Sequence, residues 1–425
     1  MRAAKWRPGM GLVVLVLSVI TVVSVGAMMY AGYDDHPDYT GGQIRGYDKQ
    51  PDVKWTADLG SLQPQVGADV SVIDSVGSTW LVRSSINQDN VFATLDSSSG
   101  KRSAAPAIDA GFGQCAIADS GVIGCSVQSP LDNRPDGFYS TQDGGSLGPR
   151  HDAPVATEVA AQGDDFLLAN NIENSVTRIT PDGKTVWQRE FDSAPALTTT
   201  DGSIIVQTAS ARTYLIDPTN GHEQYSCASC TATAYADGIA VQQNGNHRAV
   251  DFYRLNGSHV TTADRQELLH GPSSLPVVTA ASGTGELPPV QGTFVAYDPS
   301  RKTALWKATN PQLSTAAAIT CGDIAMLRKF DDSRLILGLH SGKQLGKIMR
   351  PDGPDPRRDV RGLRCVGANT SRMVFADSSG LLTAFDTHTG HVAWETPDEL
   401  GGTPAIVDGY LTIVANGVLS VLAPS

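Results

Sequence analysis

One pattern of apolar and polar residues recurs along most of this chain. Its clearest copy, LLTAFDTHTGHVAW from Leu381 to Trp394, starts with alternating apolar and polar residues, continues into a turn that contains Asp, and ends on a Trp. Alternation with a period of two is typical of a half-buried β-strand, and Asp, Asn and Gly are the residues that tight turns favour. Each copy therefore predicts two antiparallel strands joined by a turn.

Weaker copies repeat this order of strand, turn and strand. They begin at Val91, Phe138, Val176, Thr213, Ala249, Phe294 and Leu335. Their spacing of roughly 37 to 46 residues is the range in which four-stranded propeller blades repeat. Upstream of the copies, as in 314–330 and 402–415, a Gly or an Asp-Gly separates two apolar runs, which predicts a hairpin. Four strands per repeat predict one propeller blade.

The two ends of the repeat region predict how the blades form a closed ring. The last blade has only three strands before the chain stops, whereas VKWTADLG, residues 53–60, resembles a fourth strand with no blade before it. We expect these segments to pair, because closure removes the exposed strand edges. The expected fold is an all-β β-propeller of about eight four-stranded blades over residues 52–425, with seven to nine compatible with the pattern and the N-terminal strand closing the last blade.

An uncharged apolar stretch, GLVVLVLSVITVVSVGAMMYAG at 11–32, precedes the repeats. About 20 apolar residues suffice for a helix to cross a bilayer. Basic residues come before the stretch and acidic residues after it, which predicts one transmembrane signal-anchor helix with residues 1–10 in the cytoplasm. The propeller would then be extracytoplasmic, either periplasmic or on the cell surface. A cleaved signal peptide is the alternative, since the small residues around Ala27 fit a processing site.

The segment between this stretch and the repeats, residues 33–51, is polar and has no apolar periodicity. Such a composition is typical of a flexible linker. We therefore expect it to be a tether between the membrane helix and the folded body.

The phrase A-x-D-x-x-T-G-x-x-x-W, complete between Ala384 and Trp394, resembles the repeat of the quinoprotein-like (PQQ-like) β-propellers. That family includes cofactor-dependent alcohol and glucose dehydrogenases as well as cofactor-free scaffolds such as the BamB-type outer-membrane assembly factor. The resemblance implies that the Trp residues of the repeat dock neighbouring blades. This blade-docking role falls to Trp55, Trp187, Trp306 and Trp394.

Departures from the enzymes of that family favour its non-catalytic branch. Quinoprotein alcohol dehydrogenases typically carry adjacent cysteines, and this sequence has no Cys-Cys pair. DNRPDG at Asp132 has Arg134 where a calcium loop needs a ligand, so we expect a polar hairpin turn there. No P-loop or H-E-x-x-H motif occurs in the sequence. We expect no catalytic, cofactor-binding or metal-binding residue and no cofactor; a PQQ-dependent dehydrogenase or a ligand-sensing ectodomain is the alternative.

Six cysteines in an exported body predict disulfides. Cys115 and Cys125 flank a hairpin turn, so they should face each other across two strands. Cys321 and Cys365 occupy matching places in the first strands of successive repeats, where a bridge between neighbouring blades is feasible. Cys227 and Cys230 form C-A-S-C, which is either a redox-active motif or a structural clip. We expect the clip, because no helix pattern follows it.

Charge and long connections indicate the class of partner. A formal net charge of -12 disfavours nucleic acid and anionic lipid headgroups as ligands. One long connection, at 261–291, is rich in Ser, Gly and Pro, and long connections on a rigid scaffold are often functional. A second gathers Arg357, Arg358 and Arg361, which we expect to bind a charged partner. The alternative there is a solvated loop whose Asp residues balance half of the charge.

These features together predict a membrane-anchored extracytoplasmic β-propeller. Its expected function is that of a non-catalytic protein-interaction scaffold in cell-envelope assembly or in a membrane complex. The expected partners are envelope or membrane proteins, and the inter-blade loops would present the binding surface.

Overall fold

The computed structural model describes residues 39, 41–63, 67–129, 135–142, 145–245, 248–280, 292–315, 317–349 and 360–425, without the side chain of Arg361. The predicted tail 1–10 and membrane span 11–32 lie outside these residues. The described chain consists of strands with three short 3₁₀ segments, η1 (Gly60–Leu62), η2 (Val360–Gly362) and η3 (Asp398–Leu400). None of its helices has the length and apolar character needed to span a membrane.

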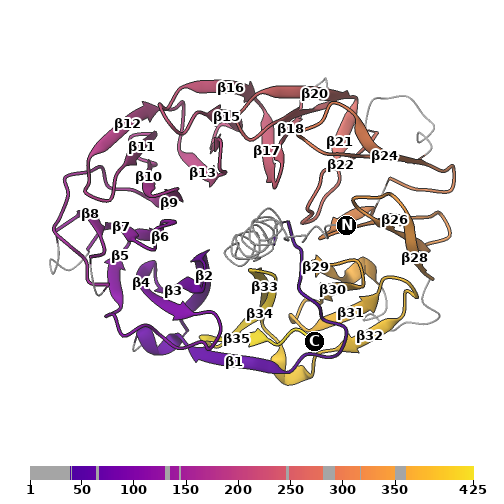
Figure 1. Cartoon of the computed structure of the whole chain (residues 1–425), viewed down its shortest axis with the longest axis horizontal. Coiled ribbons are helices and arrows are strands. Elements are labelled where there is room, and N and C mark those ends of the chain that lie inside the picture. The colour runs from indigo at the N-terminus through magenta and orange to yellow at the C-terminus, as the bar shows by residue number, and fades with distance from the viewer. Residues whose placement is uncertain are drawn as a thin grey trace, which may run out of the picture. The chain divides into compact units, whose positions relative to one another are not determined.

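The described strands form antiparallel sheets that follow one another around a ring, and we number them blades 1 to 9 (Figure 1). Blade 1 contains β2 (Asp69–Val76), β3 (Thr79–Ile86), β4 (Asp89–Asp96) and β5 (Ile108–Gly111). Blade 2 contains β6 (Gln114–Ile117), β7 (Ile123–Val127) and β8 (Gly137–Ser140). Blade 3 contains β9 (Glu158–Gln162), β10 (Asp165–Asn170), β11 (Ser175–Ile179) and β12 (Thr185–Glu190).

The middle of the described chain supplies the next three blades. Blade 4 contains β13 (Pro195–Thr199), β14 (Ile204–Thr208), β15 (Arg212–Ile216) and β16 (Glu223–Ala228). Blade 5 contains β17 (Cys230–Tyr235), β18 (Gly238–Gln243), β19 (Ala249–Tyr253) and β20 (His259–Asp264). Blade 6 contains β21 (Gln266–Leu268), β22 (Val277–Ala280), β23 (Thr293–Tyr297) and β24 (Ala304–Thr309).

The last three blades include both ends of the ring. Blade 7 contains β25 (Ile319–Cys321), β26 (Ile324–Arg328), β27 (Arg334–Gly338) and β28 (Gln344–Ile348). Blade 8 contains β29 (Arg364–Ala368), β30 (Arg372–Ala376), β31 (Leu382–Asp386) and β32 (Val392–Glu395). Blade 9 contains β33 (Thr403–Val407), β34 (Tyr410–Ala415), β35 (Val418–Leu422) and β1 (Val53–Asp58).

The repeated sequence pattern corresponds to the third strand of each blade and the turn after it. In the turn that follows β31, the Asp386 carboxylate accepts the backbone N–H groups of His388 and Thr389 at 3.0 and 2.8 Å. In blade 1, Asp96 accepts the Ser98 and Ser99 hydroxyls, and these hydrogen bonds hold the pKa of Asp96 below its usual range. The Asp recurs because its carboxylate satisfies the donors of a tight turn.

The apolar core is divided among the seams between neighbouring blades. Phe138 and Phe166 contact each other across the seam between blades 2 and 3, with ring centroids 5.5 Å apart. Phe252 and Tyr297 stack across the seam between blades 5 and 6 at 4.6 Å. Middle strands are buried on both faces, and β10 buries five of its six residues. Each blade therefore depends on both neighbours for burial of its apolar side chains.

Blade 9 confirms the predicted closure of the ring. β1 pairs antiparallel with β35, placing Val53 opposite Leu422 and Trp55 opposite Val421. Trp55 then packs against Trp80 of blade 1, with ring centroids 5.6 Å apart. An N-terminal strand thus completes the C-terminal blade, and the blade it completes packs on the first one.

The blade count lies at the upper end of the predicted range. The degenerate copy at Phe138 forms β8, the third strand of a real but incomplete blade. No regular fourth strand pairs with β8 in the described chain. Two isolated bridges, Phe138 with His151 and Thr141 with Leu147, take its place. The number of blades is ambiguous from the sequence because the residues after β8 pair with it without the apolar alternation of a strand.

Residues 41–52, which we call the strap, correct the prediction of a flexible tether over 41–51; residues 33–38 and 40 lie outside the described residues. The compact body starts at Tyr39, and Ile44 and Tyr47 within the strap are buried. The strap runs from near the middle of the ring outward past β29 to β1 at the outer edge (Figure 1). Its backbone bonds to blade 8, where Ala368 donates to the Gly42 carbonyl, and to blade 9, where Arg45 donates to the Gly409 carbonyl. Backbone hydrogen bonds of this kind need no side-chain periodicity, which is why the sequence resembles a linker.

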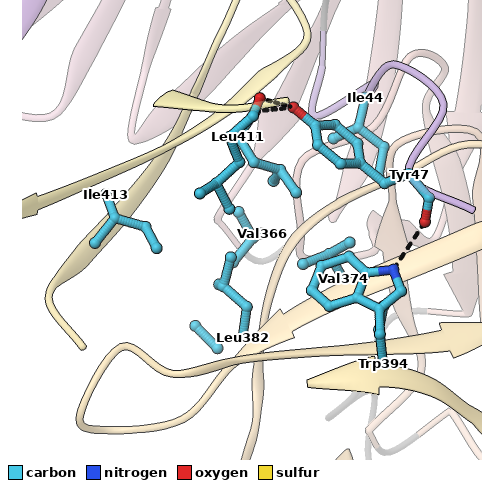
Figure 2. Packing of buried hydrophobic residues seen from close by; sticks show 11 residues of the cluster. Ile44, Tyr47, Val366, Val374, Leu382, Trp394, Leu411 and Ile413 are labelled. Atoms are coloured by element: carbon cyan, nitrogen blue, oxygen red, sulfur yellow. Dashed lines mark hydrogen bonds between the residues drawn. The ribbon is translucent and has the colours of Figure 1, made fainter. Parts of the chain in front are cut away.

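Tyr47 fastens the strap inside the seam between blades 8 and 9 (Figure 2). Its hydroxyl donates to the Leu422 carbonyl at 3.1 Å and accepts the Leu411 N–H at 2.9 Å. Burial raises the pKa of the Tyr47 phenol, so the hydroxyl keeps its proton and remains a donor at neutral pH. The carbonyl of the same residue accepts the indole N–H of Trp394 at 2.8 Å.

We predict that Tyr47→Phe lowers the free energy of unfolding by about 1–3 kcal/mol, because it leaves a buried carbonyl and a buried N–H without their partner. Urea unfolding of the full chain measures this change. Tyr39→Phe is the matched control, since it retains the aromatic face that lies 4.9 Å from the Arg45 guanidinium. Equal stability of the Tyr47→Phe variant and wild type would contradict the role assigned to this hydroxyl.

Candidate functional site

Strand direction divides the loops of the ring between two rims. In a sheet of sequential antiparallel strands, successive connections alternate between the two ends of the strands. Connections from first to second and from third to fourth strands lie on one rim, which we call the strap rim because the strap bonds there, as at Gly409. Connections from second to third strands and those leading to the next blade lie on the opposite rim, which we call the open rim.

The four Trp residues assigned to blade docking lie in the seams rather than on either rim. Each indole N–H donates to a backbone carbonyl. Three of the acceptors belong to the turn after the third strand of the following blade, and Trp394 instead uses the strap. The pairs are Trp55 with Ser97, Trp187 with Pro218, Trp306 with Leu339 and Trp394 with Tyr47.

Each of the rings of Trp55, Trp187 and Trp306 packs against a glycine in the neighbouring turn. A Cβ added at Gly100 would lie 2.3 Å from the Trp55 ring, and one added at Gly221 or Gly342 would lie 2.8 Å from the Trp187 ring or 2.5 Å from the Trp306 ring. These glycines also have positive φ, +68° at Gly100, which any side chain would oppose. The repeated sequence pattern therefore joins neighbouring blades: the Trp of one blade packs against the Asp- and Gly-containing turn of the next.

Trp394 cannot make the same contact, because blade 9 has no turn between its third and fourth strands. Its fourth strand, β1, precedes its third strand, β35, by most of the described chain, so no turn joins them. The Tyr47 carbonyl occupies the place of the missing acceptor. The strap is thus the structural substitute for the turn that circular closure removes.

The structure joins all six cysteines in the expected pairs. Cys115 and Cys125 lie directly opposite each other on β6 and β7. The Cys321–Cys365 bond links the first strands of blades 7 and 8, and Cys227–Cys230 links β16 to β17. Two of the three bonds therefore cross from one blade to the next.

The sequence predicted one long connection at 261–291, but residues 261–280 include the end of β20, all of β21 and all of β22, so that prediction was wrong for this part; residues 281–291 lie outside the described residues. In the second connection, Met349 follows β28 and Val360 precedes β29, so both lie on the open rim. Arg357, Arg358 and the side chain of Arg361 lie outside the described residues, so their assignment to a partner stays a prediction.

Exposed apolar side chains add to the open rim a feature that the sequence pattern did not reveal. Among the described residues, the largest exposed fractions of big apolar side chains are 86% for Ile172, 65% for Met349, 64% for Phe330 and 46% for Phe112. Ile172 and Phe330 lie between second and third strands, whereas Phe112 and Met349 follow fourth strands. All four connections belong to the open rim. Strand alternation cannot signal them, because they lie in turns.

A Ser, His and Asp cluster lies on the strap rim but lacks the geometry of a catalytic triad. The Ser274 hydroxyl and the Asp323 carboxylate both face Nε2 of His340, at 3.4 and 3.6 Å. A triad needs the two groups on opposite ring nitrogens, so that the imidazole can pass a proton between them. Asp323 instead accepts the Gln43 amide at 2.7 Å and the Ser274 hydroxyl at 2.9 Å. The cluster fastens the strap to blades 6 and 7.

Two cavities lie between blades of the described body, one of about 550 Å³ between blades 1 and 2 and one of about 460 Å³ between blades 5 and 6. The second is the more polar and includes Arg248, Glu267 and Gln242. These side chains already interact with other groups of the same chain. Arg248 pairs with Glu267 at 2.9 Å, and the Gln242 side chain accepts the Leu268 N–H at 2.7 Å. The polar groups named in this cavity therefore pair with other groups of the chain, and we take the surface of the open rim as the candidate site.

We predict that Gly100→Ala lowers the free energy of unfolding by about 1–3 kcal/mol more than Gly77→Ala does, because only the first methyl group meets a Trp ring. Gly77 lies in the same blade with φ of +56° and has no atom near an added Cβ, so it isolates the backbone cost. Chemical denaturation of both variants measures the difference. Equal losses would show that Trp55 is not held against Gly100.

Comparisons with known proteins add a fold-level likeness. No protein-family model and no curated protein matches this chain. Among solved structures, BamB from Moraxella catarrhalis is 12% identical with a TM-score of 0.42, and the match covers 84% of this chain and 99% of that one. The computationally designed Ika8 protein is 12% identical with a TM-score of 0.42, covering 90% and 99%. A eukaryotic initiation factor is 10% identical with a TM-score of 0.48, covering 79% and 88%. Likeness at this level gives no information on function.

Proposed function

We propose that this chain is a membrane-anchored, extracytoplasmic β-propeller that acts as a non-catalytic scaffold for protein interactions, in cell-envelope assembly or in a membrane complex. The segment 11–32 would anchor it in a cell membrane with the N-terminus in the cytoplasm. Its mechanism is the rigid presentation of the open rim to an envelope or membrane protein.

The observation that carries the proposal is the difference between the two rims. The strap rim is bonded to the chain itself, since Asp323 of blade 7, Asn369 of blade 8 and Gly409 of blade 9 all accept from or donate to the strap. The open rim carries the four most exposed large apolar side chains of the described body. Aromatic residues and Met are enriched at protein interfaces, so Phe112, Phe330 and Met349 offer contact points to another protein.

The rigidity of the ring supports presentation rather than movement. Each seam is packed with buried side chains, and Cys321–Cys365 and Cys227–Cys230 link blades covalently. A surface that does not need to be ordered on binding avoids an entropic cost. Loops held by such a body are therefore suited to recognition.

The disulfides also support the extracytoplasmic location. All six cysteines of the sequence are paired. Disulfides persist in oxidising compartments and are rare where glutathione and thioredoxin keep thiols reduced. An exported body is the location that suits a chain whose six cysteines are all in disulfides.

Cross-linking of the full-length protein in intact membranes, followed by mass spectrometry, tests the proposal. We predict a reproducible, near-stoichiometric envelope or membrane partner that is lost when Arg357, Arg358 and Arg361 are all replaced by Glu. The matched control replaces Lys302, Lys307 and Lys343 by Glu, because these exposed residues lie on the strap rim and on the outer strand β24. The control should keep the partner.

Loss of the partner in both variants would show that net charge, rather than the open rim, controls binding. Recovery of the protein alone, at matched expression and cross-linking yield, would contradict the scaffold. Stoichiometric uptake of pyrroloquinoline quinone with Ca²⁺, coupled to alcohol oxidation, would favour the dehydrogenase alternative instead.

A further inference from the structure

The Cys227–Cys230 bond lies at the crossover from blade 4 to blade 5. β16 ends at Ala228 and β17 begins at Cys230, so Ser229 is the only residue between the outermost strand of one blade and the innermost strand of the next. This connection belongs to the open rim. The disulfide closes the C-A-S-C loop around it.

The two cysteines of this bond differ in exposure. Cys230 is 3% exposed and packs with Ile205, Leu215 and Ile239, whereas Cys227 is only partly buried. The cysteines of the other two disulfides are all buried. A nucleophile from solvent can therefore reach Cys227 in the folded protein more readily than any other cysteine.

The crossover does not depend on the disulfide for its position. The Cys230 N–H donates to the Ala211 carbonyl at 3.2 Å, and the Asn244 N–H donates to the Ser229 carbonyl at 2.9 Å. The Thr213 hydroxyl donates to the Cys230 carbonyl at 2.7 Å. Three hydrogen bonds hold the connection, so opening the disulfide leaves the two blades in place.

The bond also contributes less to stability than the others. Cys227 and Cys230 are 3 residues apart, against 10 for Cys115–Cys125 and 44 for Cys321–Cys365. A short loop removes little entropy from the unfolded chain. Ser229 in addition has φ of +58°, a conformation that opposes an L-residue side chain. A bond that is accessible and adds little stability is suited to reversible exchange.

We propose that Cys227–Cys230 is a thiol–disulfide exchange site that a dithiol reduces. One thiolate of the dithiol attacks Sγ of Cys227 and breaks the Cys227–Cys230 bond, and Cys230 leaves as a thiolate that takes up a proton. The second thiol of the reductant, as its thiolate, then attacks the mixed disulfide and releases Cys227, which also takes up a proton. Two electrons pass to the protein, and the reductant becomes a disulfide.

The buried position of Cys230 is compatible with the reduced thiol as well as with the disulfide. The apolar surroundings of Cys230 favour a neutral thiol over a thiolate, and a buried cysteine packs as a small apolar side chain. The body therefore stays folded in both redox states. This site lies on the open rim beside the 2–3 turns of blades 4 and 5.

Dithiothreitol, a small dithiol, is the probe for the first experiment. The folded full-length protein in detergent is exposed to graded dithiothreitol, free thiols are trapped by alkylation, and each cysteine peptide is quantified by mass spectrometry. We expect Cys227 and Cys230 to be alkylated at least about tenfold faster than the other four cysteines, with an unchanged circular dichroism spectrum. Reduction no earlier than that of the other disulfides, or only together with unfolding, overturns the proposal.

Single variants test the direction of attack. Cys230→Ser leaves Cys227 as a free thiol at the surface, and it should form a mixed disulfide with dithionitrobenzoate in the folded protein. Cys227→Ser leaves the buried Cys230, which should react at least about tenfold more slowly. Equal rates in the two folded variants contradict the assignment of Cys227 as the attacked sulfur. If either variant does not fold, the dithiothreitol experiment on the unchanged protein decides.

Discussion

The pairing of β1 with β35 is the interaction on which the other seams depend. A blade buries its apolar side chains only against neighbours on both faces, so an open row of blades would expose one apolar face at each end. β1 and β35 bring residues from the two ends of the described body into one sheet, and that sheet packs on blade 1 through Trp55. Closure therefore turns a row of marginal sheets into a ring without exposed ends.

Closure has a structural consequence at the seam between blades 8 and 9. The turn that accepts the Trp indole in other blades is absent from blade 9, and the strap supplies the acceptor through Tyr47. The same segment then bonds along the rims of blades 7, 8 and 9. One rim is thereby occupied by the chain itself, and the exposed apolar side chains are concentrated on the other. The two rims therefore differ because the strap that accompanies closure covers part of only one of them.

Local signals explain which features were predictable from the sequence. Strand alternation, the Asp-containing turns, the hairpin around Cys115 and Cys125, and the unpaired strand at Trp55 are short-range patterns, and the structure has all of them. The strap was not predictable, because it is held by backbone bonds and by single side chains, Gln43, Ile44 and Tyr47, that follow no strand period. The incomplete blade 2 and the exposed side chains of the open rim likewise lie in irregular connections. A period of two carries no information about such residues.

Native-state amide hydrogen exchange of the full-length protein tests the closure most directly. Amides protected by a stable sheet exchange only when that sheet opens. If the ring is closed by β1, we expect the β1 amides that bond to β35 to be protected as strongly as those of β31, the third strand of blade 8. Exchange of the β1 amides at the rate of an unpaired peptide, while β31 remains protected, would contradict the closed ring.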